Sequence, residues 1–158
     1  MPPKVSVICA VFRPGGIDIL MAGLKDQEMR DFELIVIDHR YLIRRDRILQ
    51  KAKEYIPSIR TIVAPEHRRN GKWYVGASSW NTGLALAEGQ VVIMLLDYAY
   101  TPPDFVRRHW EAHQQRVKRL VVAPHAYTYL YREKMAIVPE HIDEAWFRPQ
   151  EHPELPPH

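Results

Sequence analysis

Residues 5–38 read VSVICAVFRPGGIDILMAGLKDQEMRDFELIVID and contain the pattern that decides the fold. Two continuous apolar runs, Val5 to Val11 and Phe32 to Ile37, are typical of strands that are covered on both faces of a sheet. Between these runs, Ile17, Leu20 and Leu24 recur at helical spacing. The order of strand, helix and strand predicts an α/β fold with a parallel sheet.

The same alternation continues toward the C-terminus, where apolar runs are again separated by helical patterns. Proline and glycine mark most of the boundaries, including Pro57 and Gly89. The next expected elements are a helix with Ile43, Ile48, Leu49, Ala52 and Tyr55 on its buried face and a strand over 60–64. A helix begun by Ser78 or Ser79 and terminated by Gly89 should follow, and then a strand over 90–96. The last are a strand over 120–123 and, before it, a helix from Asp104 with Phe105, Val106, Trp110, His113 and Val117 on one face.

The composition indicates one soluble domain. A chain of 158 residues with 46% hydrophobic residues can bury one core, so we expect a single domain over 1–148 and a Pro-rich extended tail over 149–158. The longest apolar stretch, 91–96, is far shorter than the roughly 20 residues of a membrane span, and the N-terminus has no signal-peptide pattern. The single cysteine, Cys9, excludes a disulfide within the chain and is expected to be a buried, inert thiol. These features favour a cytoplasmic protein, and they leave homo-oligomer formation open.

The formal charge gives little information about partners. It is +3, because 22 basic residues face 19 acidic ones. Such a mild excess attracts anions in general without predicting a nucleic-acid partner.

Polar and aromatic side chains follow the predicted strands. They are Phe12 and Arg13, Asp38 with His39 and Arg40, the loop from Glu66 to Lys72, and Asp97 with Tyr98. Ligands of open parallel sheets bind at the C-terminal ends of the strands, so these side chains are candidates for contacts with a base, a ribose and a diphosphate. The alternative is that strands simply end in polar loops.

Two further segments offer contacts for an anion. His67, Arg68, Arg69 and Lys72 form a basic loop suited to phosphate oxygens, unless it is only a solvated run of charge. The triplet 81–83, Asn-Thr-Gly, could present backbone donors near a helix start, or its glycine could serve close packing.

Three segments together resemble the family 2 glycosyltransferases, which have the GT-A fold. VSVICAVFRP, residues 5–14, is similar to the family's opening strand, and FELIVIDHRY, residues 32–41, is similar to its second strand. GASSWNTGLALAEGQVVIMLLDYAYTPPDF, residues 76–105, resembles the segment that runs through an Asn-x-Gly helix into the Asp-x-Asp motif. The resemblance covers residues 4–124 and implies a Rossmann-like, mainly parallel sheet that binds a nucleotide sugar.

The resemblance also implies roles for single residues. Phe12 matches the residue that stacks on the nucleobase, and Asp38 matches a carboxylate that accepts a hydrogen bond from uracil or its equivalent. Asn81 and Gly83 match the helix start. Asp97 matches the first aspartate of Asp-x-Asp, which contacts the ribose or the metal-bound diphosphate.

The chain departs from the family pattern at three positions. Ala99 replaces the last aspartate of Asp-x-Asp, His39 replaces the second aspartate of the uracil-binding pair, and Trp80 replaces a diphosphate-binding arginine. Mg²⁺ or Mn²⁺ could still bind between Asp97 and the diphosphate, only more weakly. Alternatively, the basic loop, including Lys72, could neutralise the leaving group.

The expected activity is inverting transfer of a sugar from a nucleoside diphosphate donor to a hydroxyl acceptor on a glycan, lipid or protein. Asp143 or Glu144 is the candidate general base. Two other hypotheses remain: a catalytically silent GT-A-like module for binding or assembly, and a nucleic-acid-binding domain, against which the near balance of charge argues.

Overall fold

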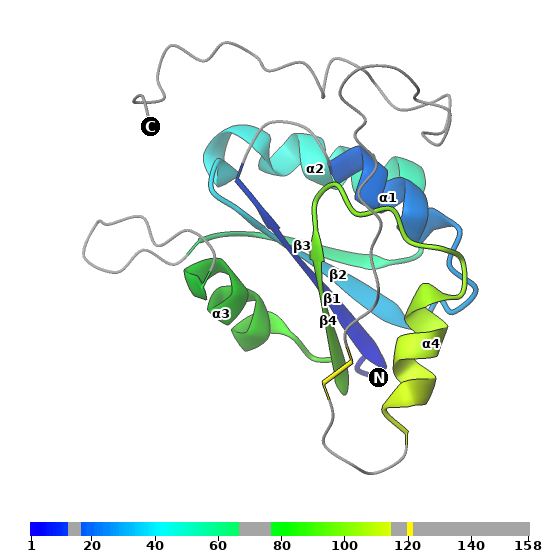
Figure 1. The fold of residues 1–158 in the computed structure, drawn as a ribbon. Helices are drawn as coiled ribbons and strands as arrows, with labels where there is room; N and C mark the ends of the chain where they lie inside the picture. The colour runs from blue at the N-terminus through cyan, green and yellow to red at the C-terminus, as the bar shows by residue number, and fades with distance from the viewer. Residues whose placement is uncertain (13–16, 67–76, 115–119, 122–158) are drawn as a thin grey trace, which may run out of the picture.

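The structure is a computed structural model, and it describes residues 1–12, 17–66, 77–114 and 120–121. Within these ranges strands and helices alternate (Figure 1). The elements are β1 (Val5–Val11), α1 (Ile17–Lys25), β2 (Phe32–Asp38), α2 (Tyr41–Tyr55), β3 (Arg60–Pro65), α3 (Ala77–Leu86), β4 (Val91–Leu96) and α4 (Phe105–Ala112).

The strands form one parallel sheet in the order β3-β2-β1-β4. Val11 at the end of β1 pairs with Asp38 at the end of β2, and Ala10 pairs with Leu96 at the end of β4. The carboxyl ends of the strands therefore lie together, at what we call the C-terminal edge of the sheet. The predicted α/β fold with a parallel sheet is confirmed.

Helices cover both faces of the sheet. Side chains alternate between the faces of a strand, so Cys9 and Val36 belong to the core under α1, α2 and α4. Ile8 and Ile35 point to the opposite face, where Trp80 of α3 packs against them. Figure 1 shows α1 and α2 on one side of the sheet and α3 on the other. Because helices cover both faces of the sheet, every residue of β1 and β2 is buried.

A buried polar network holds the opposite, N-terminal edge of the sheet. The Glu33 carboxylate accepts hydrogen bonds from Ser6 Oγ at 2.6 Å, from the Glu88 backbone N–H at 2.9 Å and from Arg60 at 3.1 Å. A Cβ atom on Gly89 would lie 2.5 Å from the backbone nitrogen of Ser6. Gly89 therefore permits close approach of the α3–β4 turn to β1, and α3 itself ends earlier, at Leu86.

The rotation of α2 differs from the prediction. Its buried residues are Arg44, Ile48, Ala52 and Tyr55, whereas Ile43 is 80% exposed. The predicted burial of Ile43 is wrong because Arg44 turns toward the sheet, where it pairs with Asp38.

Two boundaries also need correction. The prediction that Ser78 or Ser79 caps α3 is wrong, because the helix already includes Ala77 and Ser79 is buried within it. Residues 120 and 121 belong to no strand, contrary to the predicted strand over 120–123, whose other residues lie outside the described ranges. The predicted domain limit at 148 and the tail 149–158 also lie outside them.

Candidate functional site

Three of the predicted binding residues lie at the C-terminal edge of the sheet. Phe12 directly follows β1, Asp38 ends β2 and Asp97 directly follows β4. These strands are neighbours, and β1 lies between the other two. The fold thus brings together residues that are 85 positions apart in the sequence, from 12 to 97.

Asp38 is completely buried and is held by α2. Arg44 Nε donates to Asp38 Oδ2 at 3.1 Å, and the Arg44 Nη2 atom contacts Oδ1. The backbone N–H of Arg40 also donates to Oδ1, at 2.8 Å. Both carboxylate oxygens therefore accept bonds from the protein itself. The predicted ligand role of Asp38 stays a prediction.

A second polar pair connects the ends of β2 and β3. His39 Nε2 lies 2.8 Å from Glu66 Oε2, and both side chains are buried. The ring of Phe12 lies against the ring of His39, with 4.7 Å between the centroids and a tilt of 57°. His39, which replaces an aspartate of the family pattern, therefore supports the aromatic ring that is predicted to meet the nucleobase.

Asp97 is 4% exposed and begins a tight turn. The Ala99 backbone N–H donates to the Leu96 carbonyl at 3.0 Å, which turns the chain away from the sheet directly after β4.

The environment of Cys9 shows that both aspartates affect the same region. Its pKa is raised well above the ordinary value, first by burial, then by the negative charge of Asp97 and then by that of Asp38. The two carboxylates thus flank the end of β1. The neutral thiol agrees with the predicted inert Cys9.

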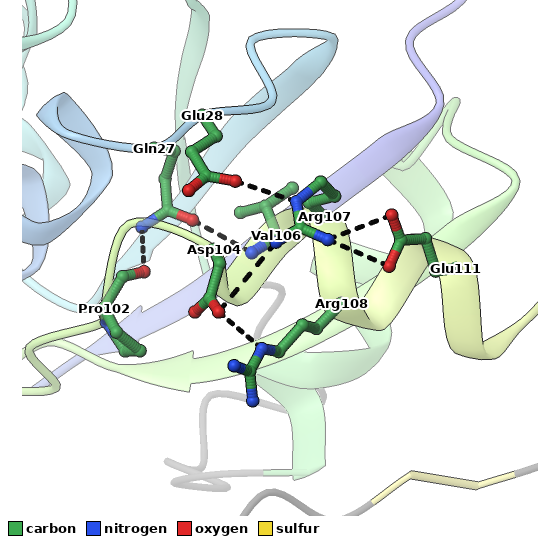
Figure 2. A network of polar contacts seen from close by, with 8 residues as sticks. All are labelled: Gln27, Glu28, Pro102, Asp104, Val106, Arg107, Arg108 and Glu111. Atoms are coloured by element: carbon green, nitrogen blue, oxygen red, sulfur yellow. Dashed lines mark hydrogen bonds and ion pairs between the residues drawn. The ribbon is translucent and has the colours of Figure 1, made fainter.

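The segment after Asp97 is fixed to the connection that follows α1 by a buried side chain, Gln27 (Figure 2). Gln27 Nε2 donates to the Thr101 hydroxyl at 3.2 Å and to the Pro102 carbonyl at 2.7 Å. Its Oε1 atom accepts the Val106 backbone N–H, at 2.9 Å, in the first turn of α4. Free N–H groups at a helix start need such acceptors. Gln27 therefore holds the loop that leads from Asp97 into α4.

Charged contacts on the surface reinforce this connection (Figure 2). Arg107 donates to Glu28 at 2.8 Å and to Glu111 at 3.0 Å. The hydrogen bond with Glu28, followed by that with Glu111, raises the pKa of Arg107 above its ordinary value. The Glu28 backbone N–H also donates to the Pro103 carbonyl, at 2.8 Å. Gln27 and Glu28, which are adjacent in the chain, thus bind the carbonyls of Pro102 and Pro103.

Asn81 and Gly83 lie on α3, on the other face of the sheet. A Cβ atom on Gly83 would lie 2.3 Å from Ile8 Cγ2, so this glycine lets α3 pack directly on β1. Asn81 is exposed on the same helix. The structure supports the packing alternative for Gly83, and the predicted ligand role of Asn81 stays a prediction.

The remaining predicted site residues lie outside the described ranges. These are Arg13, Lys72 with the rest of the basic loop 67–72, Asp143 and Glu144. Within the described ranges, no three His, Cys, Asp or Glu side chains gather to hold a metal ion. At the Asp-x-Asp position, Asp97 supplies one carboxylate and Ala99 supplies none.

Sequence reasoning missed Arg44, which neutralises Asp38, and Gln27, which fixes the loop after Asp97. It included Glu66 in a candidate loop but did not predict that Glu66 pairs with His39. Arginine and glutamine are mostly exposed in folded proteins, so the residue types alone do not predict the burial of Arg44 and Gln27. One feature of the sequence could have identified Arg44. It lies four positions before Ile48 and therefore on the same face of the helix, whereas Ile43 lies five positions before Ile48.

Comparison with protein-family models gives no matching family, and comparison with curated proteins gives no matching sequence. Solved structures do match. The mannosyltransferase PcManGT of Pyrobaculum calidifontis, in complex with GDP-Man and Mn²⁺, superposes with a TM-score of 0.56 at 24% identity. The match covers 72% of this chain and 34% of PcManGT.

TarS of S. aureus also matches, with a TM-score of 0.51 at 20% identity over 66% of this chain and 18% of TarS. The chain therefore spans about a third or less of the length of these two structures. In the described ranges, no helix is long and apolar enough to cross a membrane. The four-stranded parallel sheet and its helices have the fold of the GT-A glycosyltransferases.

Proposed function

We propose that this chain binds a nucleoside diphosphate sugar at the C-terminal edge of its sheet and transfers the sugar to a hydroxyl acceptor. The observation that carries the proposal is the joint placement of Phe12, Asp38 and Asp97 on three adjacent parallel strands. Open α/β sheets bind their ligands at this edge. PcManGT, which has the same fold, holds GDP-Man and Mn²⁺.

Each of the three residues has a distinct part in the proposed complex. The Phe12 ring, supported by His39, contacts the face of the nucleobase. Asp38 and the Arg40 backbone bound to it line the base and ribose end of the site. Asp97, on the other side of β1, lies at the diphosphate end.

A divalent cation fits this site when the donor supplies most of its ligands. Mg²⁺ and Mn²⁺ prefer oxygen ligands, and Mg²⁺ is commonly held by one or two carboxylates together with substrate phosphates. Asp97 is the carboxylate that would hold the cation, which would neutralise charge on the departing diphosphate. Because Ala99 adds no second carboxylate, we expect cation affinity to depend strongly on bound donor.

Sugar transfer then requires a base for the acceptor. A carboxylate removes the proton of the acceptor hydroxyl, whose oxygen attacks the anomeric carbon while the bond from that carbon to the diphosphate oxygen breaks. Attack from the opposite side inverts the configuration. Asp143 and Glu144 remain the candidates for this base.

Titration calorimetry with a panel of UDP-sugars and GDP-sugars, each with and without Mn²⁺, tests the proposal. We expect one base to be preferred and affinity to increase with Mn²⁺. Absence of binding to every nucleotide would contradict both the donor site and the transferase. Asp31→Asn is the control for Asp97→Asn. It should bind nucleotides as the wild type does, because Asp31 pairs with Lys4 at the opposite edge of the sheet.

A second function is favoured by two particular residues. Ala99 removes a carboxylate from the metal-binding motif, and Arg44 already neutralises Asp38. Both fit a GT-A-like module that serves binding or assembly without turnover. Release of nucleoside diphosphate from a donor, lost in Asp97→Asn and retained in Asp31→Asn, would exclude this alternative.

A further inference from the structure

Two aliphatic side chains project from the first turn of α2. Leu42 is 95% exposed and Ile43 is 80% exposed, although they are adjacent and both large. Single exposed leucines are common on protein surfaces. Two adjacent aliphatic side chains that are both almost fully exposed form a small apolar patch at the start of the helix.

The buried contacts of the helix maintain this exposure. Arg44 is held by Asp38, and Ile48 and Ala52 follow it on the buried stripe. Residues at spacing three and four share a helix face. Ile43 cannot turn inward without removing Arg44 from Asp38, so the apolar pair is part of the folded arrangement.

Positive charge surrounds the pair. Arg40, Arg45 and Arg47 flank it in the sequence, and Arg45 pairs with the exposed Asp46 at 2.9 Å. Four arginines and one acidic residue therefore occupy positions 40–47. Without Arg44, which pairs with Asp38, the segment still contains three arginines and one aspartate, a formal excess of positive charge.

We propose that the first turn of α2 docks on a membrane surface that contains anionic lipids. Leu42 and Ile43 would enter the headgroup region, and the flanking arginines would lie near lipid phosphates. Apolar side chains next to basic ones are the pattern by which helices bind the surface of a bilayer without crossing it. A nucleic acid would use the arginines and leave the aliphatic pair in water, so charge and apolarity together favour a lipid surface.

The first turn of α2 lies close to the C-terminal edge of the sheet. Tyr41, the first residue of α2, lies three positions after Asp38 at the end of β2. The docking turn is therefore next to the C-terminal edge of the sheet. The proposal does not depend on nucleotide binding, and either can fail without the other.

Sedimentation of the full chain with lipid vesicles tests the proposal. We expect binding to vesicles of phosphatidylcholine mixed with phosphatidylglycerol, weaker binding to phosphatidylcholine alone, and a decrease with added salt because salt screens the charges. Leu42→Ser combined with Ile43→Ser should lower the affinity at least about tenfold, given the transfer free energy of two aliphatic side chains.

The control variant is Leu84→Ser, which changes an exposed leucine on α3 and should leave vesicle binding unchanged. Circular dichroism checks that all variants are folded, and light scattering measures their mass in solution. Vesicle binding that is absent in the wild type, or unchanged in the double variant, would overturn the proposal. So would a dimer that the double variant converts to a monomer, since the pair would then bind a second copy of the chain.

Discussion

At the scale of single residues, the ion pair of Asp38 and Arg44 joins the end of β2 to the first turn of α2. Asp38 is completely buried, and a buried carboxylate is costly without a partner of opposite charge. Arg44 supplies that partner for Asp38. It also sets the rotation of α2, and with it the exposure of Ile43.

Replacement of Arg44 should therefore destabilise the fold strongly. Arg44→Met leaves Asp38 buried without its cation, for which we expect a loss of about 3–5 kcal/mol in the free energy of unfolding. Arg45→Met is the matched control, because Arg45 forms an exposed pair with Asp46 and should cost about 0–1 kcal/mol. Urea unfolding measures both values. Equal losses in the two variants would show that the buried pair is not stabilising.

The thiol of Cys9 should be inert in the folded protein. Burial, Asp97 and Asp38 all raise its pKa, so the thiol stays protonated and protected at pH 8. The thiol of the unfolded chain has a pKa of about 8.5. The folded protein therefore holds the Cys9 proton more tightly than the unfolded chain does, and the free energy of unfolding should decrease as the pH rises above that value.

Alkylation with iodoacetamide, followed by mass spectrometry, checks this prediction. We expect no modification of the native chain at pH 8 and one added group after denaturation in urea. Rapid alkylation of the folded protein would show that Cys9 is accessible.

At the scale of secondary structure, strands and helices differ in how far the sequence predicts them. The segments β1 and β2 were predictable because each is a continuous apolar run and is buried on both faces. The rotation of α2 was not, because it depends on a contact between residues six positions apart in different elements. Likewise, Gly89 resembles a helix stop in the sequence, but it is required by the approach of Ser6.

The packing of α3 on β1 gives a prediction at this scale. Gly83→Ala would place a Cβ atom 2.3 Å from Ile8 Cγ2, and we expect a loss of about 1–3 kcal/mol from overpacking. Ile8→Ala removes that methyl group. The double variant should therefore cost less than the sum of the two single ones, as measured by a double-mutant cycle in urea. Additive losses would contradict direct packing of Gly83 on Ile8.

At the scale of the whole molecule, the parallel sheet collects Phe12, Asp38 and Asp97 at one edge. The polar residues that follow the apolar runs, together with the predicted parallel sheet, indicated this edge, because parallel strands all end on the same side. The sequence could not show that Gln27 would fix the loop after Asp97, since this contact spans 74 positions to Thr101. The general location of a site thus follows from topology, while its rigidity depends on distant polar contacts.

The central claim is that Asp97 anchors a nucleoside diphosphate at this edge. The most direct measurement is the calorimetric affinity of GDP and UDP, with Mn²⁺, for the wild type, Asp97→Asn and Asp31→Asn. We expect Asp97→Asn to weaken the preferred nucleotide at least about tenfold, which corresponds to about 1.4 kcal/mol, while Asp31→Asn keeps the wild-type affinity. Equal affinity in the wild type and Asp97→Asn, or no nucleotide binding by the wild type, would contradict the account.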